Sequence, residues 1–242
     1  MFAAIGGLVY GPDFDNHPCG SASNSYTPWT LVSMSPITGT GAAGDPYTVV
    51  IVVNAGATGV QMTETLTYLT GAPRAGISLT FTELAPPAGP EGGTTFDAFV
   101  GADLYLADND DGFGVLQGTS AGGRAADASC LQLQYIILLE ANTPSNRHAA
   151  EGYSTIWSEI SAANLSNTVD TICEDNGAAL QWTGLVVGPG ISAVISTGVS
   201  FTGSAVPVAA DVPTLSTLGL AALVLLLAVV GYVLVRRVSL GA

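Results

Sequence analysis

Short apolar runs separated by turn-forming residues make up most of the chain. Between residues 26 and 199, β-branched and aromatic residues alternate with clusters of Gly, Pro, Asn and Asp. Runs of this length and spacing are typical of an antiparallel β-sandwich. The pattern predicts strands at Tyr47–Asn54, Val60–Leu69, Ile77–Leu84, Phe96–Leu106, Cys130–Leu139, Ala178–Val187 and Ile191–Phe201.

The alternation within one run predicts which side chains face the core. Met62, Glu64 and Leu66 fall on one face of the strand Val60–Leu69, and threonines occupy the other face. Successive side chains point to opposite faces of a strand, and threonine is favoured on a pleated surface exposed to water. Because Glu64 interrupts the apolar face, we expect that face to be incompletely buried.

Two local signals interrupt the strand pattern. Ile156 and Ile160 lie four residues apart within Tyr153–Ala163, a spacing that predicts one short amphipathic helix. The tripeptide Gly188-Pro189-Gly190 predicts a tight hairpin connector between the last two strands. The expected fold is therefore mainly β, a sandwich with one short helix.

The expected organisation has four parts. Residues 1–25 are predicted to be an irregular lead segment, 26–202 an extracytoplasmic β-sandwich domain, 203–211 a linker and 212–242 a sorting signal. Residues 1–10 are apolar, but they have no basic region and no clear cleavage site of the kind that a secretory leader carries. We therefore expect that the natural start lies further upstream.

The charge of the chain is strongly one-sided. It has nineteen acidic residues, no Lys and five Arg, for a net charge of −14. Such a surface repels phosphate backbones and anionic lipid headgroups, which argues against a nucleic-acid role. Without Lys, neither a Lys–Asn isopeptide crosslink nor Schiff-base chemistry is available.

The C-terminal region contains the longest apolar run. Leu218–Val235 has eighteen residues without a charge. A helix of this length measures about 27 Å, close to the roughly 30 Å of a bilayer's hydrocarbon core. Arg236 and Arg237 follow directly, and the positive-inside rule places them in the cytoplasm. The run therefore predicts a single transmembrane helix with the preceding domain outside the membrane.

A short motif precedes this run. The order of motif, apolar helix and basic tail resembles bacterial C-terminal sorting signals, and specifically the IPTL type of the PEP-CTERM-like group, written Ile-Pro-Thr-Leu-Ser-x-Trp-Gly. The positions that carry the motif here are Val212, Pro213, Thr214, Leu215, Ser216 and Gly219, with Val212 in place of Ile and Leu218 in place of Trp. The resemblance implies processing by an exosortase-like membrane enzyme. A permanent membrane anchor is the alternative.

Residues 45–200 carry a second resemblance, to a domain of exported bacterial proteins. It rests on Asp103-Leu104-Tyr105-Leu106, Gly112-Phe113-Gly114, Glu151-Gly152-Tyr153-Ser154 with Trp157, and the stretch from Asp175 to Trp182. The resemblance implies a Cys where Leu104 stands, and it implies no activity.

Three cysteines, Cys19, Cys130 and Cys173, allow one internal disulfide and leave one thiol. We expect the pair Cys130–Cys173, since both residues lie within the predicted domain. A three-cysteine metal site with His17 or His148 is the alternative. It requires closely spaced ligands such as C-x-x-C, which the sequence does not contain.

One acidic cluster suggests a cation. In Asp108-Asn109-Asp110-Asp111-Gly112, alternating oxygen ligands precede a glycine, which is what Ca²⁺ prefers, and Asp108, Asp110 and Asp111 would be its ligands. The terminal bidentate Glu of a complete calcium loop is missing. Because acidic residues before glycine are also ordinary turn chemistry, a plain turn is the alternative. No other cofactor is expected.

Catalytic signatures are weak. His17 and His148 both lie in loops, and no Gly-x-Ser-x-Gly elbow accompanies them. Carboxylate pairs for glycoside chemistry can be drawn from Glu140, Glu151, Glu159 and Asp175, as on any acidic surface. We therefore expect that this protein is not an enzyme.

The tryptophans are the candidates for sugar stacking. Trp157 and Trp182 lie at predicted core positions, whereas Trp29 follows Pro28 near a strand start and is the most available for a ligand. The sequence favours an exported cell-surface or matrix protein with a structural or interaction role. It would be held at the inner membrane by its C-terminus or released after processing. The alternatives are an adhesion module that depends on carbohydrate or calcium, with surface polysaccharide as partner, and, more distantly, a glycosidase-like enzyme.

Overall fold

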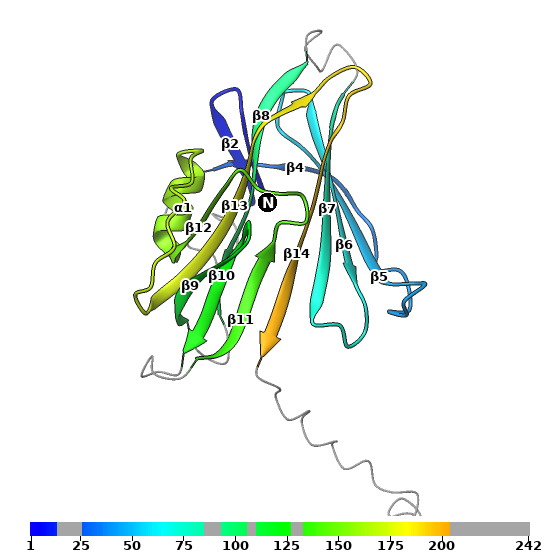
Figure 1. Ribbon diagram of the computed structural model, residues 1–242. Coiled ribbons are helices and arrows are strands. Elements are labelled where there is room, and N and C mark those ends of the chain that lie inside the picture. Colours follow the sequence, from blue (N-terminus) through cyan, green and yellow to red (C-terminus); the bar gives the residue numbers. More distant parts are fainter. Residues whose placement is uncertain (14–25, 85–92, 106–109, 127–132, 204–242) are drawn as a thin grey trace, which may run out of the picture. The chain divides into compact units, whose positions relative to one another are not determined.

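The computed structural model describes residues 1–13, 26–84, 93–105, 110–126 and 133–203. These residues belong to one compact unit, Met1–Gly203, which is mainly β with one short helix (Figure 1). Its elements are β1 (Phe2–Ile5), β2 (Leu8–Gly11), β3 (Thr27–Pro28), β4 (Thr30–Met34), β5 (Tyr47–Asn54), β6 (Val60–Tyr68), β7 (Arg74–Glu83), β8 (Thr94–Asp103), β9 (Asp111–Gln117), β10 (Ser120–Ala126), β11 (Leu133–Glu140), β12 (Arg147–Gly152), α1 (Tyr153–Ser161), β13 (Glu174–Val187) and β14 (Ala193–Gly203).

The described strands form one continuous sheet. Its order is β3-β2-β1-β8-β13-β9-β10-β11-β14-β7-β6-β5-β4, and β12 pairs with β13 off this path. The continuity depends on β13, which is fourteen residues long. Glu174 and Asp175 at its start pair with β9, while Gly177 and the residues after it pair with β8. One large sheet therefore takes the place of two separate sheets.

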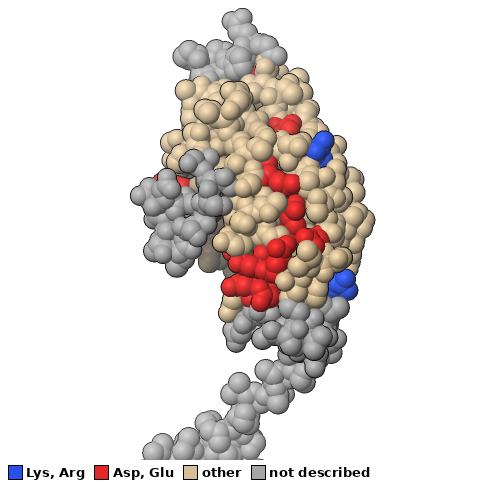
Figure 2. Space-filling model, turned by 90° about the vertical axis from the view of Figure 1, so that its left-hand side faces the viewer, with Lys and Arg blue, Asp and Glu red and all other residues tan. Residues whose placement is uncertain are grey.

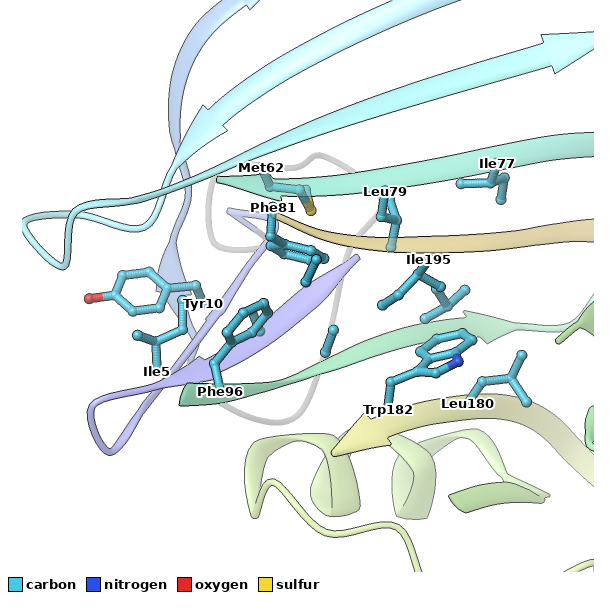
Figure 3. Packing of buried hydrophobic residues seen from close by; sticks show 14 of the residues in the cluster. Ile5, Tyr10, Met62, Ile77, Leu79, Phe81, Phe96, Leu180, Trp182 and Ile195 are labelled. Atoms are coloured by element: carbon cyan, nitrogen blue, oxygen red, sulfur yellow. The ribbon is translucent and has the colours of Figure 1, made fainter. Parts of the chain in front are cut away.

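The main core lies between the two halves of this sheet. One half contains β1, β2, β3, β8, β12 and β13, and the other contains the remaining strands. Phe96 and Trp182 point inward from β8 and β13, and they meet Phe81 and Ile195 from β7 and β14 (Figure 3). The rings of Phe81 and Phe96 are 4.8 Å apart and tilted by 54°, the offset geometry that aromatic pairs favour. Met62 is 2% exposed, as the alternation in β6 predicted, and Glu64 on the same face is half-buried.

Helix α1 covers the opposite face of β8 and β13. Its buried residues Ile156, Trp157 and Ile160 pack on Phe2 and Phe99 in a second cluster. A side chain at Gly101 would put its Cβ 2.5 Å from a terminal methyl group of Ile160, so the glycine lets the helix pack this closely without moving that side chain. The predicted helix is confirmed, and its last turn ends at Ser161.

The lead segment was predicted to be irregular, and the structure corrects this for residues 2–11. Phe2, Ala3 and Ile5 of β1 are at most 2% exposed, and β1 pairs with β8 in the middle of the sheet. Gly6 and Gly7 adopt positive φ angles of 60° and 83° between β1 and β2. Two such residues form the tight turn that a two-residue hairpin requires, so this short apolar run folds as a hairpin.

The predicted hairpin between the last two strands is also corrected. The turn itself forms, because Gly188 and Ile191 exchange backbone hydrogen bonds of 3.1 and 2.8 Å. However, β14 pairs with β7 and β11 rather than with β13. Leu180 and Ile195 are both fully buried in the same core. The turn therefore carries the chain from one half of the sheet to the other.

Candidate functional site

Strand pairing gathers carboxylates from three strands at one end of the sheet. Asp111 of β9 lies opposite Asp175 of β13, next to Glu174, and Asp103 of β8 lies opposite Gly177. Figure 2 views the side of the molecule that carries α1, β12 and β9, and it shows acidic side chains gathered in a band. We call Asp103, Asp110, Asp111, Glu174 and Asp175 the acidic cluster.

The acidic cluster perturbs its own ionisation. Burial, and then repulsion from the other four carboxylates, raises the pKa of Asp175 to about 6. Its Oδ1 atom is buried and has no hydrogen-bond partner among the described residues. Burial and the nearby Asp110 also raise the pKa of Asp103, against the opposing effect of a hydrogen bond from the backbone N–H of Leu104. The site therefore favours a bound positive charge or proton.

The acidic cluster contains part of the predicted calcium site. Asp110 and Asp111 belong to it, while Asp108 lies outside the described residues. Among the residues that the structure describes, no group of three or more His, Cys, Asp or Glu side chains is arranged to hold a metal ion. The described carboxylates alone do not provide the ligand set that Ca²⁺ requires, and calcium binding stays a prediction.

A second carboxylate pair lies on β12 and α1. The Ser166 hydroxyl donates to Glu151 Oε1 at 3.2 Å, and the Ser166 backbone N–H donates to Glu159 Oε2 at 3.1 Å. Burial, together with the nearby Glu159 and Asp170, raises the pKa of Glu151. This pair holds the loop after the helix in place.

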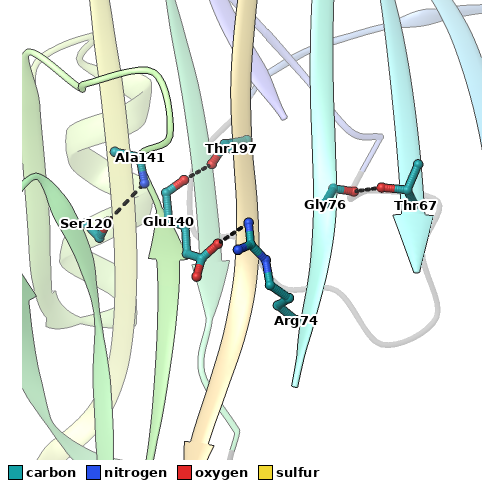
Figure 4. Close-up of polar contacts among 7 residues, drawn as sticks. All are labelled: Thr67, Arg74, Gly76, Ser120, Glu140, Ala141 and Thr197. Carbon is teal, nitrogen blue, oxygen red and sulfur yellow. Dashed lines mark hydrogen bonds and ion pairs between the residues drawn. The ribbon is translucent and has the colours of Figure 1, made fainter. Parts of the chain in front are cut away.

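Of the other carboxylates proposed for glycoside chemistry, Glu140 lies in a different setting. It forms an ion pair with Arg74, 3.1 Å between Oε2 and Nη2 (Figure 4). Its backbone carbonyl accepts a 2.6 Å hydrogen bond from the Thr197 hydroxyl. Glu140 therefore fastens β11 to β14 and β7.

Trp29 is a corner residue of the sheet. It is the single residue between β3, in one half, and β4, in the other. Its Nε1–H donates to the Met1 carbonyl at 3.0 Å, and its ring lies 5.7 Å from that of Tyr10. These contacts give Trp29 a packing role. A stacking role for Trp29 stays a prediction, while Trp157 and Trp182 are buried at 8% and 2% exposure, as expected.

A pocket of about 380 Å³ lies at the turn between β6 and β7. Its walls include Pro46, Tyr68, Leu69 and Pro73, and Arg74 lies among them. Tyr68 is 42% exposed, so an aromatic face is available there. No local sequence pattern indicates this pocket, because it forms only when the loop that contains Pro46 approaches the turn. The cross-strand pair Tyr47 and Tyr68 is the signal that could have indicated it.

Several predicted residues lie outside the described part of the chain. They are Cys130, Val212, Pro213, Thr214, Leu215, Ser216, Gly219, Arg236 and Arg237. Cys173 is disulfide-bonded, and its pairing with Cys130 stays a prediction. Within the described ranges, no helix is both long and apolar enough to cross a membrane. The predicted span 218–235 falls beyond those ranges.

Solved structures give distant likenesses. The chain is similar to a protein described as a kojibiose phosphorylase from the human microbiome (8% identity, TM-score 0.40) and to the GH36 alpha-galactosidases AgaA (12%, 0.35) and AgaB (12%, 0.34) from Geobacillus stearothermophilus. The matches cover 71%, 74% and 74% of this chain, but only 20%, 29% and 28% of those proteins. With every one of these TM-scores below 0.5, the likenesses support no conclusion about activity.

Curated proteins give no match to the chain. The family model for the IPTL-CTERM motif matches residues 212–237. This match covers the motif, the apolar run and the paired arginines. The chain therefore carries an IPTL-CTERM motif, a C-terminal sorting signal.

Proposed function

We propose that this protein is exported, sorted through residues 212–237 and displayed at the cell surface or in the extracellular matrix, where its β domain has a non-enzymatic structural or interaction role. The observation that carries the proposal is the IPTL-CTERM motif. An exosortase-like enzyme is the processing partner, and the apolar run 218–235 is the membrane anchor before processing.

Two properties of the domain support this role. The disulfide at Cys173 suits an oxidising compartment outside the cytoplasm. The buried aromatic core and the continuous sheet suit a secreted domain that has to resist unfolding outside the cell. Glu151 holds a loop and Glu140 joins strands, and neither lines the 380 Å³ pocket.

The test uses the full chain, expressed behind a secretory leader, in a bacterium that has an exosortase-like enzyme and in a strain from which that enzyme is deleted. We expect surface or medium fractions to contain the protein only in the first strain, with membrane retention in the second. The double variant Pro213→Ala/Leu215→Ala should be retained in both strains, whereas Val206→Ala/Val208→Ala in the preceding linker should behave like the unchanged chain. Recovery of the unchanged chain in the cytoplasm of both strains would refute the proposal.

A second candidate function is an adhesion module for surface polysaccharide. The pocket at the β6–β7 turn favours it, because an exposed tyrosine ring can stack on a sugar while the Arg74 guanidinium offers hydrogen-bond donors and the Thr67 hydroxyl oxygen an acceptor. Figure 4 shows Thr67 donating to the Gly76 carbonyl next to this pocket.

A glycan array, run with and without Ca²⁺, separates the two candidates. Reproducible binding that is lost in Tyr68→Ala and kept in Tyr105→Ala, an exposed tyrosine elsewhere, would support adhesion through the pocket. Loss in Trp29→Ala alone would place the stacking surface at the corner instead. Absence of binding under both conditions would leave the structural role as the better account.

A further inference from the structure

Strand β4 is an outer strand with exposed apolar side chains. It pairs only with β5, and all five of its residues are exposed. Leu31 is 62% exposed, Val32 51% and Met34 65%, and Ile37 just beyond the strand is 71% exposed. An outer strand also leaves alternate backbone N–H and C=O groups without a strand partner. We call Leu31, Val32, Met34 and Ile37 the β4 edge.

The other outer strands of the described sheet are closed. β3 is two residues long and includes Pro28, which cannot donate a backbone hydrogen bond. The outer side of β12 is covered, because the Ala150 N–H donates to the Thr168 carbonyl at 3.0 Å and the Asp170 N–H donates to the Ala150 carbonyl at 2.8 Å. In the described part of the chain, β4 is therefore the strand with a side open to pairing.

Charge indicates what can cover the β4 edge. The stretch Tyr26–Gly44 has no charged residue, in a chain with nineteen acidic and five basic residues. Two copies of so acidic a protein repel each other at most orientations, and a face without carboxylates is where they can approach. A basic partner would instead be attracted to the acidic side chains that gather in a band on the face shown in Figure 2.

We propose that β4 pairs with β4 of a second copy of this chain, which forms a twofold dimer. Antiparallel pairing of two identical strands is self-complementary, so each copy supplies the backbone groups and the apolar side chains that the other requires. The register shift between Leu31 and Ser33 marks a bulge, which twists the strand and keeps the pairing short. Because the other edges are closed, association stops at the dimer.

This inference goes beyond the proposed export and does not depend on it, since it is tested on the purified full chain in detergent. Sedimentation at increasing concentration should give a dimer. The double variant Leu31→Glu/Met34→Glu should be monomeric over the same range, with an unchanged melting temperature. The control Val194→Glu/Ile172→Glu adds the same charge at sites that are 58% and 64% exposed, and it should remain dimeric.

Crosslinking identifies the strand. In a chain that also carries Cys19→Ser, single cysteines placed in turn at positions 31 to 34 should give a covalent dimer at the position nearest the twofold axis, because opposed strand residues lie about 4.5–5.5 Å apart, within disulfide range. Ser196→Cys, on the interior strand β14, should give none. A monomeric unchanged chain would overturn the proposal. So would a dimer that neither the glutamate pair disrupts nor any β4 cysteine captures, since that dimer would use another surface.

Discussion

Replacement of Phe2 by alanine tests whether the first strand belongs to the core. Phe2 is 1% exposed, and its ring lies 5.0 Å from that of Tyr26 and 5.8 Å from that of Trp157. Two glycines complete its surroundings: a Cβ at Gly11 would lie 2.6 Å from the ring, and one at Gly101 would lie 3.7 Å from it. Glycines have no side chain that can move into the space left by a truncated ring.

The expected loss of stability follows from these surroundings. Replacement of a buried Phe by Ala leaves a cavity and lowers the free energy of unfolding by about 3–5 kcal/mol, and sites whose surroundings cannot move into the cavity lie at the upper end. For a domain of this size, each kcal/mol lowers the melting temperature by about 2–4 °C, which gives a fall of roughly 10 °C or more. Since domains are stable by only about 5–15 kcal/mol, this variant should unfold at a clearly lower urea concentration.

Urea and thermal unfolding, followed by circular dichroism, provide the measurement. Leu8→Ala is the matched control in the same hairpin: Leu8 is 51% exposed, so its loss should change the free energy of unfolding by no more than about 0.5 kcal/mol. If Phe2→Ala were as mild as Leu8→Ala, β1 could not be part of the core, and the correction to the lead segment would be wrong.

Three further predictions concern polar groups. The pKa of Asp175 is raised to about 6 in the folded protein, so between about pH 6 and pH 4 the folded protein binds a proton that the unfolded chain does not bind. Stability should therefore rise as the pH falls from about 6 to 4. Asp175→Asn should raise the melting temperature at pH 7.5 and flatten that rise. Gln181 is 1% exposed and accepts from the Leu165 N–H at 2.9 Å, so Gln181→Leu should cost about 2–3 kcal/mol in urea unfolding by leaving that donor unpaired. The Arg74–Glu140 pair is half exposed on the arginine side, and Arg74→Ala should cost about 1 kcal/mol or less, with a smaller cost in 1 M salt; a cost that salt does not change would argue against an ion-pair origin.

Strands rich in β-branched residues could be located from the sequence, and glycine-rich strands could not. β5 has the predicted bounds, Tyr47–Asn54. In contrast, Gly114 of β9 and Gly122 of β10 interrupt the apolar pattern in the sequence, as residues between two strands would. Both lie against backbone, because a Cβ would come within 2.2 Å of the Ala150 carbonyl oxygen or within 1.9 Å of the Ile137 carbonyl oxygen. Glycine is needed for this packing, and only the folded chain shows it.

The candidate sites differ in the same way. Asp110 and Asp111 could be singled out because they are adjacent in sequence. Asp103, Glu174 and Asp175 join them only through the pairing of β8, β9 and β13, which no local pattern predicts. The sorting signal is the opposite case, since its motif, apolar run and arginines are contiguous and were recognisable from residues 212–237 alone.

The most direct test of the central claim is the intact mass of the protein recovered from the cell surface or medium. Its mass should be smaller than that of the same protein from a strain without the exosortase-like enzyme. The difference should equal a C-terminal piece that begins within or next to residues 212–219 and includes the run 218–235. Equal masses in the two strains, with the protein found inside the cell in both, would contradict the account.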